Sequence, residues 1–278
     1  MSNPTLEPFF APDGERFIPN PISKGPWGPT TLHGRVVVGL MGAEIERRHC
    51  PAEFSPARLT VDMYKLPDLS PLRMATRVVR DGLRIKVIEA ELFSNDTPVA
   101  LATAQLLRRT DAPPGVVWTP PNWDVPPPDQ IAPPTDPRAA MSGMWAMRPI
   151  AGAMGTHGDR RVWMLEIRDL VAGWPLTPFG RVALAADFAS PFANAGDQGL
   201  GYINSDVTVY LHRTPVTGWI GFEVRNHGAT DGVAIGDCFL YDEQGPIGTA
   251  SVCALAQPRG NMMLQTARRS TDQTGRVQ

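Results

Sequence analysis

Cysteine is scarce in this sequence, and the shortage excludes two kinds of scaffold. The three cysteines, Cys50, Cys238 and Cys253, are far apart, odd in number and never arranged as a Cys-x-x-Cys pair. Neither a disulfide framework nor a zinc knuckle is therefore expected, and we expect a reduced, cytoplasmic protein. The five histidines include no HExxH pattern and no paired metal spacing, so we expect no metal and no other cofactor.

A charge excess and long apolar runs are lacking as well. The net charge is −2 and no Lys/Arg block occurs, which gives no electrostatic basis for binding nucleic acid. No apolar run reaches the ~18 residues that a membrane span needs, and Met1–Phe10 lacks the basic-then-apolar pattern of a signal peptide. A GxSxG elbow, a GxGxxG turn and a phosphate loop are also missing. Nothing in the sequence decides whether the chain forms a homo-oligomer.

Proline, by contrast, is abundant and concentrated. Ten of the 29 prolines lie between Asp111 and Pro137, a density that excludes a helix or a central strand and favours an extended connector. Trp118 and Trp123 in this stretch indicate that it lies against the protein surface. The predicted organisation is an N-terminal repeat (15–110), a connector (111–137), a C-terminal repeat (138–260) and a polar tail (261–278).

The two halves beside the connector repeat the same features in the same order. These features are a Gly-Arg-Val start of an apolar helix (34–36 and 180–182), a cation-x-Pro strand end (65–67 and 213–215) and a proline after a turn (98 and 246). The offset between the copies stays between 146 and 148 residues. One such match could arise by chance, but three in order indicate an internal duplication.

Each half is predicted to contain one apolar helix followed by several long strands. Helices are expected near 34–47 and 178–190, and strands at 59–67, 73–79, 84–94, 99–108, 206–215, 219–226, 232–242 and 246–257. Neither half covers its own helix and sheet edge well, so the halves should pair. The predicted fold class is α+β, a double hotdog in which two antiparallel sheets each wrap around a long helix.

Several stretches resemble a known family. They are Ala183–Phe188, Asn204–Arg213, Leu240–Gly245 and, in the first half, Gly25–Trp27 with His33–Gly34. The series is similar to the thioesterase-like superfamily of the acyl-CoA thioesterase II type. The resemblance covers most of 20–110 and 160–259. It implies a double hotdog fold, hydrolysis of acyl-CoA thioesters and a role in fatty acid metabolism.

The resemblance also implies a way of activating water. Family members of this type hold the attacking water with a carboxylate, a hydroxyl and a glutamine, without a covalent intermediate. Asp206 occupies the aspartate position, and the hydroxyl position falls near Asn226 and His227. The glutamine should lie between Ser251 and Ala254, where the sequence has none.

Asp206 and His227 are the predicted catalytic residues. A carboxylate within reach of a water molecule can act as a general base, although an aspartate at a strand start can also cap local amides. If the strands 206–213 and 219–227 formed a hairpin, His227 would lie near Asp206 and could assist it. Otherwise His227 is a loop histidine.

His33, Gly34 and Arg35 are the predicted oxyanion or substrate group. They begin the first apolar helix, where amide donors and the helix dipole can polarise a thioester carbonyl. Gly34 would permit close approach of the substrate. A simple helix start with small residues for packing explains the same pattern equally well.

Three functions remain open on the sequence alone. The first is hydrolysis of an acyl-CoA or acyl-carrier thioester by water that an aspartate activates. The missing glutamine motivates the second, a protein that binds such thioesters without turnover. The third is a hotdog hydratase or dehydratase that uses Asp206 and His227 as acid and base.

Overall fold

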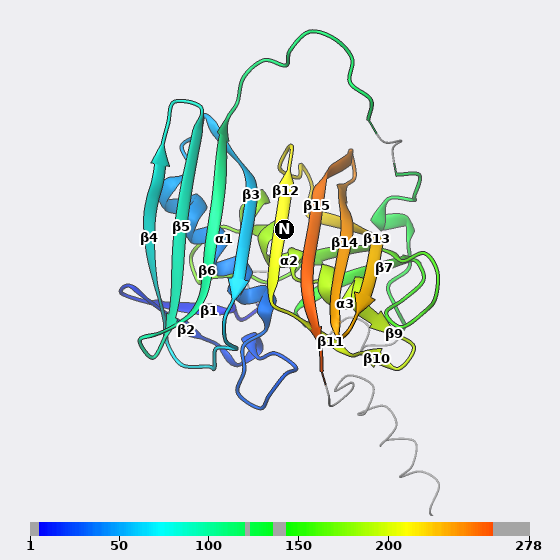
Figure 1. Ribbon diagram of the computed structural model, residues 1–278, viewed down its shortest axis with the longest axis horizontal. Helices are drawn as coiled ribbons and strands as arrows, with labels where there is room; N and C mark the ends of the chain where they lie inside the picture. The colour runs from blue at the N-terminus through cyan, green and yellow to red at the C-terminus, as the bar shows by residue number, and fades with distance from the viewer. Residues whose placement is uncertain (1–5, 120–122, 136–142, 258–278) are drawn as a thin grey trace, which may run out of the picture.

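A thirteen-stranded antiparallel sheet forms the framework of the molecule (Figure 1). The computed structural model describes residues 6–119, 123–135 and 143–257; the predicted polar tail, 261–278, lies outside these residues. The eight long strands, each of ten residues or more except the six-residue β12, are β3 (Phe54–Met63), β4 (Leu72–Asp81), β5 (Ile85–Ser94), β6 (Thr97–Arg108), β12 (Asp206–Leu211), β13 (Trp219–Thr230), β14 (Val233–Asp242) and β15 (Gly245–Ala256). The others are β1 (Phe10–Asp13), β2 (Arg16–Pro19), β7 (Trp145–Ala151), β8 (Arg161–Glu166), β9 (Ala195–Gly196), β10 (Gly199–Leu200) and β11 (Tyr202–Asn204), of which β9 and β10 form a separate two-stranded sheet.

The long strands follow the same order in both halves. The sheet runs β4-β5-β6-β3 and continues as β12-β15-β14-β13, so that β3 and β12 form the junction. These two strands pair antiparallel, with Thr60 opposite Thr208 and Asp62 opposite Asp206. The expected pair of separate sheets is therefore one continuous sheet, because the edge strand that each half leaves open is hydrogen-bonded by the other.

The central helices differ in length. α1 spans Gly34–His49, as expected, but the predicted second helix is divided into α2 (Pro178–Ala186) and α3 (Ala189–Asn194). Pro191 explains the break, since it has no N–H to donate to the carbonyl of Asp187, four residues earlier. The Asp187 carbonyl instead accepts from Ser190 N–H at 3.1 Å. Asp187 is thereby placed at the helix end rather than on a helix face.

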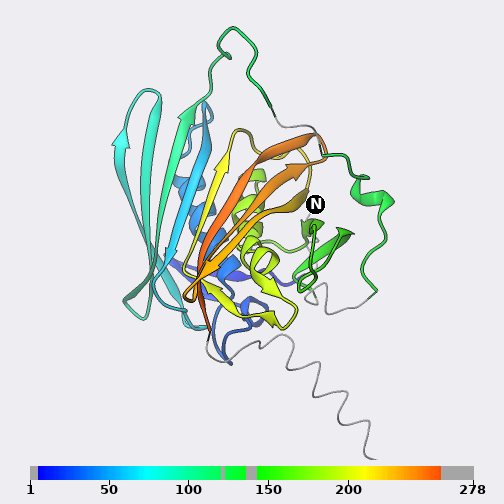
Figure 2. The ribbon, with the colours of Figure 1, turned by 45° about the vertical axis from the view of Figure 1, so that its right-hand side comes forward.

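Close packing of α1 against α2 fixes the two helices relative to each other. Glycines of α1 face α2, because a Cβ at Gly42 would lie 2.7 Å from the Ala183 Cβ, and one at Gly39 would lie 2.7 Å from Leu184 Cδ1. Figure 2 shows both helices on one side of the curved sheet. Most apolar residues of α1, including Val36, Leu40 and Met41, are fully buried there.

Successive side chains of each strand alternate between this helix-covered face of the sheet and the opposite face. In β12, Val207, Val209 and Leu211 are buried, whereas Tyr210 is exposed. Since successive side chains of a strand point to opposite faces, Asp206 and Tyr210 lie on the face away from the helices.

The proline-rich connector contains a single short 3₁₀ turn, Pro128–Gln130, among the residues of 111–135 that the structure describes. Trp123 packs on the second half of the sheet, stacked on Tyr241 with ring centroids 4.3 Å apart and edge-on to Trp163 at 4.8 Å. Gly221 makes room for it, because a Cβ there would lie 2.2 Å from the Trp123 ring. Trp118, in contrast, is 80% exposed.

In the part of the chain that the structure describes, no helix is both long and apolar enough to cross a bilayer. The His, Cys, Asp and Glu side chains of these described residues form no group of three or more that could hold a metal ion.

Candidate functional site at the start of the first helix

The start of α1 carries an unusual cap. His33 is the N-cap residue, and its Nδ1 accepts the backbone N–H of Arg35 at 3.4 Å. Most helices use Ser, Thr, Asp or Asn at this position. Among the described residues, the Gly34 N–H has no hydrogen-bond acceptor. The helix therefore offers a free donor, at the positive end of its dipole.

Asp187 lies directly against this helix start. A Cβ on Gly34 would lie 2.9 Å from Asp187 Oδ2, so only glycine leaves room for the carboxylate there. Asn204 Nδ2 donates to Asp187 Oδ1 at 2.9 Å, and His33 Nδ1 is 3.7 Å from Oδ2. The aspartate is 5% exposed. The break in the second helix and the glycine of the first thus bring a buried carboxylate to a helix N-terminus.

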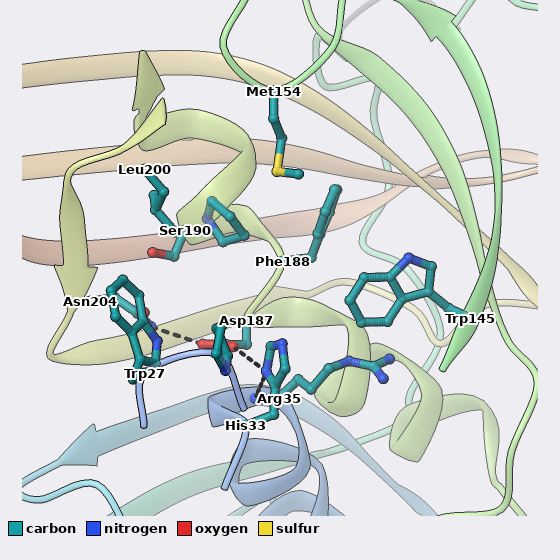
Figure 3. A pocket seen from close by; sticks show the side chains of 12 residues that line it. Trp27, His33, Arg35, Trp145, Met154, Asp187, Phe188, Ser190, Leu200 and Asn204 are labelled. Atoms are coloured by element: carbon teal, nitrogen blue, oxygen red, sulfur yellow. Dashed lines mark hydrogen bonds and ion pairs between the residues drawn. The ribbon is translucent and has the colours of Figure 1, made fainter. Parts of the chain in front are cut away.

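Two pockets meet at this carboxylate. The first, about 480 Å³ including open solvent at its mouth, is lined by Asp187, His33, Arg35, Ser190 and Asn204 together with aromatic and apolar side chains (Figure 3). The apolar lining consists of Pro26, Trp27, Trp145, Met154, Phe188, Pro191 and Leu200. A mostly apolar pocket with a few converging polar groups is the usual form of a small-molecule site.

The second pocket lies on the other side of the same carboxylate. It measures about 750 Å³ by the same count and shares Trp27, Asp187 and Asn204 with the first. Its remaining lining includes Gly34, Val37, Met63, Tyr64, Lys65, Ile203 and Leu255. A ligand that passes from one pocket to the other must cross the start of α1 and the Asp187 carboxylate.

The Arg35 side chain also lines the first pocket, but its charge is paired with a buried carboxylate. It is 1% exposed, forms an ion pair with the buried Glu166 and lies 4.2 Å from the Trp145 ring. Burial raises the pKa of Glu166, and the Arg35 charge opposes that rise. Of the predicted group at 33–35, His33 and Gly34 thus border the carboxylate, whereas the Arg35 guanidinium is held by its partner beneath Trp145.

Asp206 is not among the residues that line either pocket. Its Oδ1 accepts the backbone N–H of Cys253 at 2.6 Å. Burial raises the pKa of Asp206, the Cys253 bond opposes the rise and the charge of Asp62 adds to it. The carboxylate joins β12 to β15 on the face away from the helices.

The strands of Asp206 and His227 do not form the hairpin that would bring these two residues together. β12 pairs with β3 and β15, so β15 and β14 separate Asp206 from His227 on β13. His227 lies on the helix-covered face, where its Nδ1 is 2.9 Å from Asn194 Oδ1. The two side chains therefore face opposite sides of the sheet and cannot share a proton.

The cysteines offer no thiolate near the pockets. Burial raises the pKa of Cys50 to about 11 and also raises the pKa values of Cys238 and Cys253. None of the three lines either pocket. A thiol nucleophile at this site is therefore disfavoured.

Sequence reasoning missed Asp187, Ser190 and Asn204 as site residues. A signal was present, because Asp187 is the one charged residue in the apolar run Val182–Ser190. An isolated carboxylate in such a run must find polar partners when it is buried. Its partners come from α1 and β11, which no local pattern connects to it.

Comparison with known protein families gives matches for both halves. The chain matches an acyl-CoA thioesterase N-terminal domain over residues 23–107 and an acyl-CoA thioesterase C-terminal domain over residues 120–251. The chain belongs to the acyl-CoA thioesterase family. The resemblance inferred from the sequence is confirmed, and the C-terminal match begins within the proline-rich connector.

Solved structures confirm the hotdog fold of the family. A putative thioesterase from Novosphingobium aromaticivorans is 20% identical, with a TM-score of 0.70 over 91% of this chain and 100% of that one. A hotdog-fold protein of unknown function from Alicyclobacillus acidocaldarius is 16% identical, with a TM-score of 0.71 over 89% and 95% of the two chains. An acyl-CoA thioesterase II from Mycobacterium marinum is 15% identical, with a TM-score of 0.62 over 80% and 90%. No curated protein sequence matches this chain.

Proposed function

We propose that this thioesterase-family protein hydrolyses acyl-CoA thioesters at the start of α1, with Asp187 as the general base. The observation that supports this proposal is the buried Asp187 carboxylate, which lies at the junction of two pockets and against a helix N-terminus. A carboxylate placed beside a helix dipole and an amide donor has the two functions that hydrolysis needs, water activation and charge stabilisation.

The residues around Asp187 can hold the attacking water. The hydroxyl of Ser190 and the amide of Asn204 line the same pocket as the carboxylate. A carboxylate, a hydroxyl and an amide are the same chemical groups that the family resemblance implies, supplied here from the helix break and β11. The first pocket would therefore not need the glutamine that the last strand lacks.

The proposed reaction proceeds without a covalent intermediate. The water oxygen bonds to the thioester carbonyl carbon as Asp187 takes one water proton. The Gly34 N–H at the helix start stabilises the oxyanion. The C–S bond then breaks, and the leaving thiolate takes the proton from Asp187, which yields a carboxylic acid and free CoA thiol.

The two pockets suggest how the substrate is oriented. The aromatic lining of the first pocket suits the acyl group, while Tyr64 and Lys65 line the second pocket, where the pantetheine arm would leave toward the CoA phosphates. Since the first pocket is the smaller, we expect turnover of short or ring-bearing acyl groups to exceed that of palmitoyl-CoA. A series of acyl-CoAs assayed by thiol release measures this preference.

Two matched aspartate variants test the site. Asp187→Asn keeps the size of the side chain but removes the base, so kcat should fall by ~10²–10⁴-fold. Asp206→Asn is the control, because the asparagine oxygen can still accept the Cys253 N–H outside the pockets. The reverse ranking would return the general base to Asp206.

Turnover of the wild-type protein tests the function itself. Release of CoA from at least one acyl-CoA is the expected result. Tight binding of acyl-CoA without CoA release would identify the protein as a binding protein. Hydration of an enoyl-CoA without hydrolysis would identify a hydratase; either result overturns the proposed hydrolysis.

A further inference from the structure

The outer ring nitrogen of His33 is a buried polar atom without a partner. His33 is 9% exposed, and its Nε2 has no hydrogen-bond partner among the residues that the structure describes. A buried polar group without a partner is costly. Figure 3 shows the ring projecting from the start of α1 into the first pocket, toward Phe188 and Trp145. Nε2 is therefore available to a ligand in that pocket.

The helix cap determines which ring nitrogen carries the proton. A backbone N–H can only donate, so Nδ1, which receives the Arg35 N–H, must act as an acceptor. In the neutral imidazole the proton then lies on Nε2. The nearest carboxylate oxygen, Asp187 Oδ2, is 3.7 Å from Nδ1, which is beyond hydrogen-bond distance. The unpartnered atom of His33 is thus an N–H donor.

We propose that the His33 Nε2–H donates to the carbonyl oxygen of the bound thioester and, with the Gly34 N–H, stabilises the oxyanion that water attack creates. The inference rests on the proposed hydrolysis. An oxyanion is best stabilised by donors fixed before the reaction, and the cap fixes the His33 ring from the opposite side. His33 is then a catalytic residue, and the cap is what orients it.

Three charged side chains lie near His33. Asp187 approaches Nδ1 from the end of the second helix, and Arg35 follows His33 on α1. Glu166 of β8 interacts electrostatically with His33, and its charge is paired with Arg35. Because Nδ1 accepts the Arg35 N–H, the ring forms no hydrogen bond to Asp187, and that carboxylate is left available to act as the base.

His33→Asn separates the catalytic role from the structural one. Asparagine is a favoured N-cap and can accept the Arg35 N–H, but it is too short to replace the Nε2 donor. We expect kcat to fall by ~10²–10³-fold, the loss typical of a missing oxyanion donor, with little change in KM or in the thermal midpoint. His33→Ala should lose the same activity and also lower the midpoint. His33→Gln, whose amide reaches farther, should recover part of the activity.

The outcomes distinguish this inference from the proposed function. Wild-type hydrolysis with unchanged kcat in His33→Asn would overturn the role of His33 and leave the hydrolysis standing. Absence of hydrolysis in the wild type would overturn the proposed function, and this inference with it. Nitrogen-15 NMR of labelled histidine provides a readout independent of turnover. The neutral His33 ring should carry its proton on Nε2, and a proton on Nδ1 would overturn the inference.

Discussion

Single residues show how burial decides the chemistry of this protein. Asp187 follows the last residue of α2, and Asp206 is the first residue of β12. The sequence predicted a catalytic role for Asp206 only. Asp187 lies between the two pockets and has a side-chain partner in Asn204. Asp206 instead accepts the main-chain N–H of Cys253 on the neighbouring strand. Position in the family pattern indicated Asp206, but pocket geometry favours Asp187.

The pH dependence of stability should reveal the environment of Asp206. Its pKa is raised in the folded protein, first by burial and also by Asp62. The folded protein therefore keeps the Asp206 proton at a pH where the unfolded chain has released it. The stability that this bound proton contributes is lost as pH rises through the pKa of Asp206 in the folded protein. Asp206→Asn removes the titration. We expect wild-type stability to decline relative to the variant as pH rises above the ordinary aspartate value of ~3.9.

Urea denaturation of both proteins across the acid range measures this difference. Asp197→Asn, the same substitution at an exposed aspartate, serves as a control that leaves the Asp206 titration in place. A wild-type stability that rises relative to Asp206→Asn with rising pH would contradict the assigned environment.

At the scale of elements, the long strands and α1 could be predicted because their signals are local. Alternating apolar residues and turn prolines located all eight long strands to within two residues at each end, except both ends of β3 (Phe54 and Met63), the end of β12 at Leu211 and the end of β13 at Thr230. β1 and β2 have only four residues each, and Pro149 argues against a strand at β7. The break after α2 was not predicted, because the apolar run there resembles one continuous helix. The break follows from Pro191, which has no N–H to donate to the Asp187 carbonyl.

The crossing of α1 and α2 gives a prediction at this scale. Gly42 has no space for a side chain, since its Cβ would lie 2.7 Å from the Ala183 Cβ. Gly42→Val should force the helices apart and lower the free energy of unfolding by about 1–3 kcal/mol, as overpacking does. Gly201→Ala is the matched control, because nothing lies within 4 Å of its Cβ position. Equal stability of the two variants in urea denaturation would refute the close crossing.

At the scale of the whole molecule, pairing of β3 with β12 builds the site. The pairing makes one sheet from two similar halves and sets α1 against the broken second helix. His33 and Gly34 come from the first half, and Asp187 and Asn204 from the second. Sequence patterns within either half could not show this combination, because it depends on contacts more than 150 residues apart. Neither half alone contains the site.

The connector that joins the halves is anchored by one of its two tryptophans. Trp123 fills the space above Gly221 and stacks on Tyr241, whereas Trp118 is 80% exposed. Trp123→Ala should therefore release the connector and destabilise the protein by less than the ~3–5 kcal/mol of a fully buried aromatic. Trp118→Ala should change stability by no more than about 0.5 kcal/mol.

Limited proteolysis and thermal unfolding distinguish the two tryptophan variants. Cleavage within 111–135 should be faster in Trp123→Ala than in the wild type, since a segment without its anchoring contact opens more often. Trp118→Ala should be cleaved at the wild-type rate. Hydrolysis should be retained in both, because neither tryptophan lines the two pockets that meet at Asp187. Equal cleavage of the two variants would mean that Trp123 does not hold the connector, and a loss of turnover in Trp123→Ala would mean that the connector also supports the site.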